Sequence, residues 1–146
     1  MRRIFPVLAF VSWLAGCSDE SAGEVDGGGP TLEIGIIDHF GDSEGILVAP
    51  ETVEREAPFS VEVITYARGC YVADVVEVES SSEVVTLTPY DRRLEGDVCT
   101  DGERRLSHSA ELAFATPGSR TIEIVGRKVD ADEDLLIRVS TDIVVE

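Results

Sequence analysis

The chain has 146 residues, with 12 basic and 29 acidic side chains and a formal charge of −17. This length allows one ordinary domain with a tail. A hydrophobic content of 43% is too high for a fully disordered acidic chain. Nucleic-acid affinity comes mostly from clustered Lys and Arg, so a pI near 4.3 argues against a nucleic-acid partner.

The first sixteen residues have the proportions of a secretory signal. Arg2 and Arg3 give it a positive start, and residues 4–15 form an apolar stretch broken by Pro6 and Ser12. A spanning helix needs about 20 apolar residues, so this stretch is too short for a membrane anchor and is typical of an export signal. The alternatives are a buried helix or an ordinary signal peptide with an incidental cysteine.

The sequence LAGC at residues 14–17 resembles the lipobox of bacterial lipoproteins. The resemblance implies removal of residues 1–16, lipidation of the Cys17 sulfur and acylation of the new amino terminus. Several acyl chains hold a protein on a membrane firmly, at about 0.8 kcal/mol per buried CH₂. Ser18 resembles the class sorted to the outer membrane. The resemblance therefore implies a lipid-anchored protein of the bacterial cell envelope, at the outer membrane.

Residues 17–30 predict a flexible acidic tether. After the modified cysteine, the sequence SDESAGEVDGGGP contains four acids, no base and four glycines, so it buries too little apolar area to offset its ordering entropy. A Gly-rich coil of this length reaches roughly 20 Å. Residues 1–16 contain two arginines and no acid, so their removal changes the formal charge from −17 to −19. The charges are expected to hold the domain away from anionic headgroups.

Residues 31–146 show the two-residue alternation of β-strands. Successive strand side chains point to opposite faces, so each run offers one face to a core. No run keeps a helical period over three turns, and we expect essentially no helix. The runs cover residues 32–36, 46–53, 59–66, 72–79, 84–88, 105–114, 121–124 and 135–145.

Seven or eight short strands predict an all-β domain, a two-sheet antiparallel sandwich. Residues 114–124, FATPGSRTIEI, resemble the strand–Pro-Gly–strand hairpin of bacterial immunoglobulin-like and fibronectin-III-like modules. The resemblance implies an immunoglobulin-like fold. The alternative is an eight-stranded barrel such as a lipocalin, which usually has longer strands and more aromatic lining.

Cys70 and Cys99 are predicted to form a disulfide, because two thiols in an exported domain favour one. Closing a loop of about 30 residues stabilises by about 3.5 kcal/mol in the chain-entropy model. The bond would tie a long polar loop to a sheet edge, unlike the mid-strand bond of antibody domains. A redox-active pair is the alternative, but the CxxC spacing is missing.

Asp130, Asp132 and Asp134 are the candidate metal ligands, since three alternating carboxylates can present oxygen to Ca²⁺. Leu135 and Thr141 occupy the places of the turn glycine and the bidentate glutamate, so the EF-hand pattern fails. A solvated loop between two strands is the alternative, and it is preferred. A second acidic loop, with Asp38, Asp42 and Glu44, has the same two interpretations.

The two histidines give no clear catalytic site. His108 alternates with Leu106 and Ala110, which predicts a hydrogen-bonded side chain in or beside the core rather than a zinc ligand. Ser107 and Ser109 flank it but point to the other face of the strand, so neither forms a nucleophile–base pair with His108. His39 is expected at a strand end.

The chain contains no GxSxG, GxGxxG, P-loop or HExxH motif. We therefore expect a non-catalytic envelope lipoprotein without a cofactor, an interaction or structural module with an unidentified envelope protein as partner. A calcium-dependent binding or adhesion module is the alternative. An envelope enzyme is the third hypothesis, and Tyr66, Tyr71 and Tyr90 would give it a small exposed aromatic patch.

Overall fold

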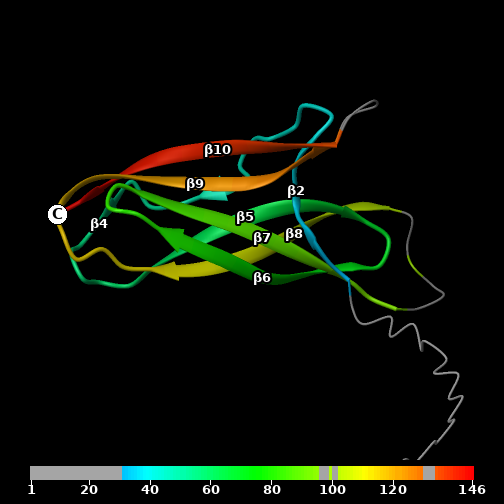
Figure 1. Cartoon of the computed structure of the whole chain (residues 1–146), viewed down its shortest axis with the longest axis horizontal. Coiled ribbons are helices and arrows are strands. Elements are labelled where there is room, and N and C mark those ends of the chain that lie inside the picture. The colour runs from blue at the N-terminus through cyan, green and yellow to red at the C-terminus, as the bar shows by residue number, and fades with distance from the viewer. Residues whose placement is uncertain (1–30, 96–98, 100–101, 130–133) are drawn as a thin grey trace, which may run out of the picture.

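The computed structural model describes residues 31–95, 99, 102–129 and 134–146, and every regular element in these residues is a β-strand. This confirms the all-β class. Figure 1 shows the long β9–β10 hairpin on one side of the molecule and β2 crossing from it toward β5. The strands are β1 (Leu32–Ile34), β2 (Ile36–His39), β3 (Leu47–Val48), β4 (Thr52–Val53), β5 (Phe59–Arg68), β6 (Tyr71–Ser80), β7 (Val84–Arg93), β8 (Glu103–Leu112), β9 (Gly118–Val129) and β10 (Asp134–Val145).

The described residues form ten strands where seven or eight were expected, because two of the predicted runs are divided. Gly35 separates β1 from β2, and residues 49–51 separate β3 from β4. The Gly35 N–H donates to the Pro89 carbonyl at 2.8 Å, while the Gly35 carbonyl accepts from the Arg127 N–H at 2.9 Å. The chain therefore changes its partner strand from β7 to β9 at this glycine.

The sheet is mixed, so the expectation of purely antiparallel pairing was wrong. Antiparallel ladders join β9 to β10, β5 to β8 and β6 to β7, but β9 runs parallel to both β7 and β2. The parallel β7–β9 pair arises because the intervening β8 pairs with β5 in the other layer. The chain reverses direction between β7 and β8 and again between β8 and β9, so β9 runs in the same direction as β7.

The layers of the sandwich follow from these pairings. One layer has the strand order β6–β7–β9–β10, the other has β3–β5–β8, and β2 is hydrogen-bonded to both β9 and β5. On β5 and β9, most of the positions that alternation predicted to face inward are buried; Phe59 is half-buried, and Tyr66, predicted on the opposite face of β5, is buried as well. The most deeply buried aliphatic side chains are Ile37, Val61, Val63, Leu87, Ile122 and Ile124.

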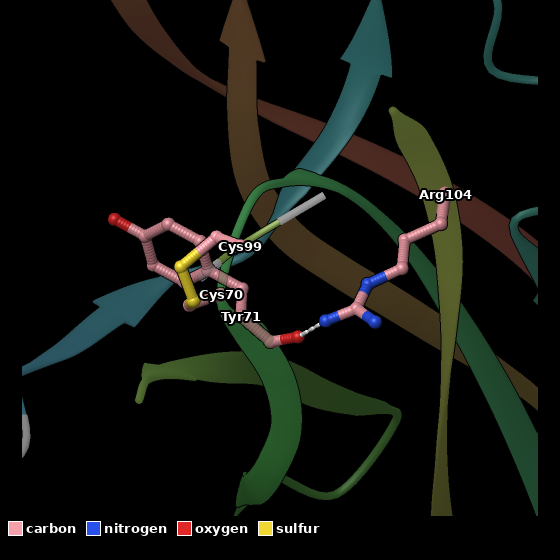
Figure 2. The surroundings of a disulfide bond; sticks show 4 residues. All are labelled: Cys70, Tyr71, Cys99 and Arg104. Atoms are coloured by element: carbon pink, nitrogen blue, oxygen red, sulfur yellow. Dashed lines mark hydrogen bonds between the residues drawn. A yellow bond between two sulfur atoms is a disulfide. The ribbon is translucent and has the colours of Figure 1, made fainter. Parts of the chain in front are cut away.

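The predicted disulfide between Cys70 and Cys99 is present; the two cysteines are 29 positions apart in sequence and their Cα atoms are 5.0 Å apart. Cys70 directly precedes β6, and its carbonyl accepts from the Leu94 N–H at 2.7 Å. The bond thus fastens the β7–β8 connection to the start of β6. Figure 2 shows Arg104 of β8 donating to the Tyr71 carbonyl beside this bond.

The leader, Cys17 and the tether lie outside the described residues, and the predictions made for them stay predictions. No helix in the described part of the chain is long and apolar enough to cross a bilayer.

Candidate functional site

The acidic loops do not form a metal centre in the part of the chain that the structure describes. Asp130 and Asp132 lie outside it, and of Asp134 only its place at the start of β10 is described. In the second loop, the Asp38 carboxylate accepts from the Gly41 N–H at 2.7 Å and so holds its own turn. No group of three or more ligating side chains occurs among the described residues. Calcium binding stays a prediction.

His108 lies in the core and is hydrogen-bonded, as predicted. Its Nε2 is 2.9 Å from Asp91 Oδ1 and 3.1 Å from Thr65 Oγ1, and the Thr65 hydroxyl donates to the same carboxylate oxygen at 3.0 Å. All three side chains are buried. Ser107 and Ser109 point to the exposed face, where they bond Glu62 and Ser60.

The geometry of this cluster is that of a hydrogen-bonded core group. A nucleophile–base–acid triad uses the two ring nitrogens of histidine for different partners. Here Nε2 faces both Thr65 and Asp91, while Nδ1 is buried with no partner among the described residues. Thr65 is completely buried and Asp91 is 4% exposed, so the hydroxyl is not presented to a substrate.

A cleft of about 290 Å³ lies directly beside this cluster, where β5 and β9 end and β6 and β8 begin. Asp91 belongs both to the buried cluster and to the wall of the cleft. The apolar part of the wall comes from β1, β2, β5 and the end of β9, with the side chains of Ile34, Ile36, Ala67 and Val129. A cavity of this size is at the small end of ligand sites.

An aromatic wall lines one side of the cleft. The His39 ring lies 6.0 Å from the Tyr66 ring in a stacked arrangement and 4.5 Å from the Phe40 ring in a T-shaped one. The Arg105 guanidinium lies 5.6 Å from the Tyr66 ring centre. Phe40 is 61% exposed, with a left-handed φ of 55°. Its ring forms the rim of the cleft, where it is accessible to a partner.

The charged groups of the cleft are mostly paired with one another. Glu33 accepts from the Tyr71 hydroxyl at 2.9 Å and from Arg127 at 3.3 Å. Glu103 lies 2.8 Å from His39 and 3.7 Å from the Arg68 guanidinium. Each glutamate therefore has a cation or a potential cation against it.

Both tyrosines of the cleft are held in the neutral form. Burial raises the pKa of Tyr66, and the neighbouring Asp42 carboxylate raises it further. Burial likewise raises the pKa of Tyr71, with a further contribution from the hydrogen bond to Glu33. Their hydroxyl groups are hydrogen-bond donors at neutral pH.

Sequence reasoning did not find this cleft. His39 was expected at a strand end and does end β2, but nothing near it in sequence indicated Glu103 as its partner. Glu33 and Arg127 are 94 positions apart. The expected exposed patch of three tyrosines does not form, because Tyr66 is buried and Tyr90 faces Glu77 on the opposite side of β7 from Asp91.

Comparison with family models, curated proteins and solved structures gave no significant match.

Proposed function

We propose that this protein is a non-catalytic interaction module, held at the bacterial outer membrane by a lipid on Cys17, and that the cleft is where it binds its partner. The observation that carries the proposal is the cleft itself. It combines an exposed aromatic rim at Phe40 with charged groups that are already oriented by hydrogen bonds. Preorganised polar groups around an apolar cavity are typical of a binding site.

The β-sandwich gives this site a firm support. Its lining residues come from seven strands and from Phe40, which directly follows β2. The Cys70–Cys99 bond fastens the two connections beside Tyr71. A site on rigid elements loses less entropy when it binds. The immunoglobulin-like character expected from residues 114–124 belongs to this proposal as well, because such sandwiches serve widely as interaction modules.

The anchor is supported by the sequence LAGC at residues 14–17, by the apolar stretch before it and by the positive charges of Arg2 and Arg3. A tether with a reach of roughly 20 Å would let the domain meet partners beyond the headgroups. Its four acids would be repelled by an anionic membrane surface.

Two measurements on full-length protein expressed with its own leader test the proposal. Intact-mass spectrometry should find a lipidated Cys17 as the first residue, and a Cys17→Ser variant should leave the membrane fraction. An unmodified amino terminus in the wild type would refute the anchor.

The cleft is tested by photo-crosslinking in intact cells from a benzophenone amino acid at position 40. The matched control is the same group at Leu136, which is 63% exposed on β10 and outside the cleft. A discrete adduct from position 40 and none from position 136 supports the proposal. Equal adducts from both positions, or none from position 40, would count against it.

A further inference from the structure

The carboxylate of Asp91 is only partly hydrogen-bonded by its neighbours in the described structure. It is 4% exposed, yet it lines the cleft. Its Oδ1 receives both the Thr65 hydroxyl and the His108 ring nitrogen. None of the hydrogen bonds among the described residues goes to Oδ2. One oxygen of a nearly buried carboxylate therefore has no donor in the part of the chain that the structure describes.

Gly35 lies close beside this oxygen of Asp91. Asp91 is directly opposite Glu33 of β1 and Ala73 of β6 in the two ladders. The next residue after β1 is Gly35, and a Cβ placed there would lie 3.1 Å from Asp91 Oδ2 and 2.4 Å from the Thr65 methyl group. A side chain at position 35 would crowd both groups, so the packing against Asp91 and Thr65 requires a glycine there, and Asp91 is open only toward the cleft that it lines.

The charges of the cleft favour a cation at this position. Arg127 lies against Glu33 and Arg68 lies 3.7 Å from Glu103. In the described chain the basic group within ion-pair distance of Asp91 is the His108 ring, which contacts Oδ1, and no Lys or Arg lies against Oδ2. A buried carboxylate is costly unless it is paired and hydrogen-bonded. The chain carries a formal charge of −17, which raises the local concentration of cations.

The aromatic wall favours the same ligand chemistry. Tyr66 already has the Arg105 guanidinium over its ring, 5.6 Å from the centre. The rings of His39, Phe40 and Tyr71 also line the cleft. Rings beside a carboxylate are a typical environment for ammonium and guanidinium groups.

We propose that the cleft takes a protonated amine or guanidinium group, which donates to Asp91 Oδ2 and lies against the aromatic wall. This inference rests on the proposed function, because it names the ligand chemistry of the same cleft. A cavity of about 290 Å³ suits one basic side chain or one small amine.

The test is titration of the ¹⁵N-labelled mature chain in a non-ionic detergent, followed by NMR. The probes are N-acetyl-lysine methylamide, its neutral counterpart N-acetyl-norleucine methylamide, and N-acetyl-glutamate methylamide. We expect the lysine probe to shift the amide signals of Glu33, Tyr71 and Asp91 and to bind about tenfold more tightly than the norleucine probe. Val144 on β10 should not shift.

A fourth probe, n-butylammonium, distinguishes the two sources of the cation. Tighter binding of the capped lysine would assign the site to a basic side chain of a protein partner, and equal binding would assign it to a free amine. Either result supports a cation site. Equal or tighter binding of the glutamate probe, or no shift of the cleft signals with either cation, would overturn it.

Asp91→Asn tests the carboxylate directly, and it should reduce the preference for lysine over norleucine about tenfold. The matched control is Asp142→Asn, which makes the same charge change at an exposed position on β10. Should Asp91→Asn fail to fold, the wild-type titration alone decides the question.

If the glutamate probe binds in the cleft, the proposed interaction module is still supported and the cation site is refuted. If no probe shifts the amide signals of the cleft residues, the cation site is refuted. The proposed interaction module is then still tested separately, by the mass spectrometry of Cys17 and by the crosslinking from position 40.

Discussion

Three buried polar residues from three different strands set the character of this domain at the scale of single residues. Thr65, Asp91 and His108 come from β5, β7 and β8 and share one carboxylate oxygen. Buried polar groups are tolerated when they are hydrogen-bonded to one another. Removing one member should leave another without its partner.

Thr65→Val keeps a similar side-chain shape and removes the hydroxyl that donates to Asp91 at 3.0 Å. Because hydrogen bonds to a charged group are among the stronger ones, we expect the free energy of unfolding to fall by about 1.5–3 kcal/mol in urea denaturation. Ser60→Ala removes an exposed hydroxyl bonded to Ser109 and should change it by less than about 0.5 kcal/mol. Equal losses in the two variants would contradict the role assigned to the buried cluster.

The tyrosines predict how stability depends on alkaline pH. Burial raises the folded-state pKa of Tyr66, Tyr71 and Tyr90 above the ordinary 10.0. A raised pKa stabilises the fold fully below pH 10, and the contribution is lost as the pH rises through the folded pKa. Tyrosinate absorbance of the native chain should titrate above pH 10 and return to about 10 in denaturant. Identical native and denatured titrations would show that the hydroxyls are not held as described.

At the scale of elements, the passage of β2 between β9 and β5 depends on a close approach of backbones. A Cβ at Gly126 of β9 would lie 2.5 Å from Ile37 Cγ2 and 3.0 Å from the Gly35 carbonyl oxygen. Ile37 is completely buried, so it has no free space to move into. A glycine is required here by packing.

Gly126→Ala should therefore lower the free energy of unfolding by about 1–3 kcal/mol, the usual cost of overpacking a core. Gly102→Ala is the matched control, because a Cβ there meets no atom within 4 Å. Urea denaturation of both variants checks the difference. A Gly126→Ala variant as stable as the control would mean that β2 and β9 lie further apart.

The disulfide makes an element-scale prediction as well. Replacing Cys70 and Cys99 together by serine removes a bond that closes 29 positions of chain. In the chain-entropy model, this lowers the free energy of unfolding by about 3.5 kcal/mol. Reducing the wild type should lower its free energy of unfolding, measured by urea denaturation, by the same amount, and should leave that of the double variant unchanged. A midpoint that is insensitive to both treatments would show that the bond adds no stability.

At the scale of the whole molecule, the excess of acidic side chains works against the compact state. The tether and the domain, residues 17–146, carry a formal charge of −19 because the two arginines of residues 1–16 are not among them, and self-repulsion of this kind destabilises folded proteins. Salt screens it, since the Debye length falls from about 30 Å at 0.01 M to about 3 Å at 1 M.

We expect Tm to rise when sodium chloride is increased from about 0.01 M to about 1 M, as measured by calorimetry. Glu79→Gln removes one exposed charge from β6, so it should raise Tm at low salt and leave it unchanged at high salt. A Tm that falls with salt would show that attractive ion pairs, such as Arg92 with Asp74, outweigh the repulsion.

The sequence alone predicted what depends on neighbouring residues. Two-residue alternation predicted the strands and the inward residues of several of them, as at Val61, Val63 and Ile122. The same alternation placed His108 inside and Ser107 outside. The cysteine count predicted the Cys70–Cys99 bond. Each of these follows from local geometry or from residue chemistry, which a single chain displays directly.

The tertiary structure decided everything that depends on which strands become neighbours. Alternation is the same for parallel and antiparallel pairing, so the parallel β7–β9 and β2–β9 ladders had no local signal. The splitting of one run at Gly35 was equally hidden, because the chain changes its partner strand there from β7 to β9, and both strands are far away in the sequence. The cleft joins Glu33 to Arg127 and His39 to Glu103 across such distances. Its chemistry therefore exists only once the chain has folded.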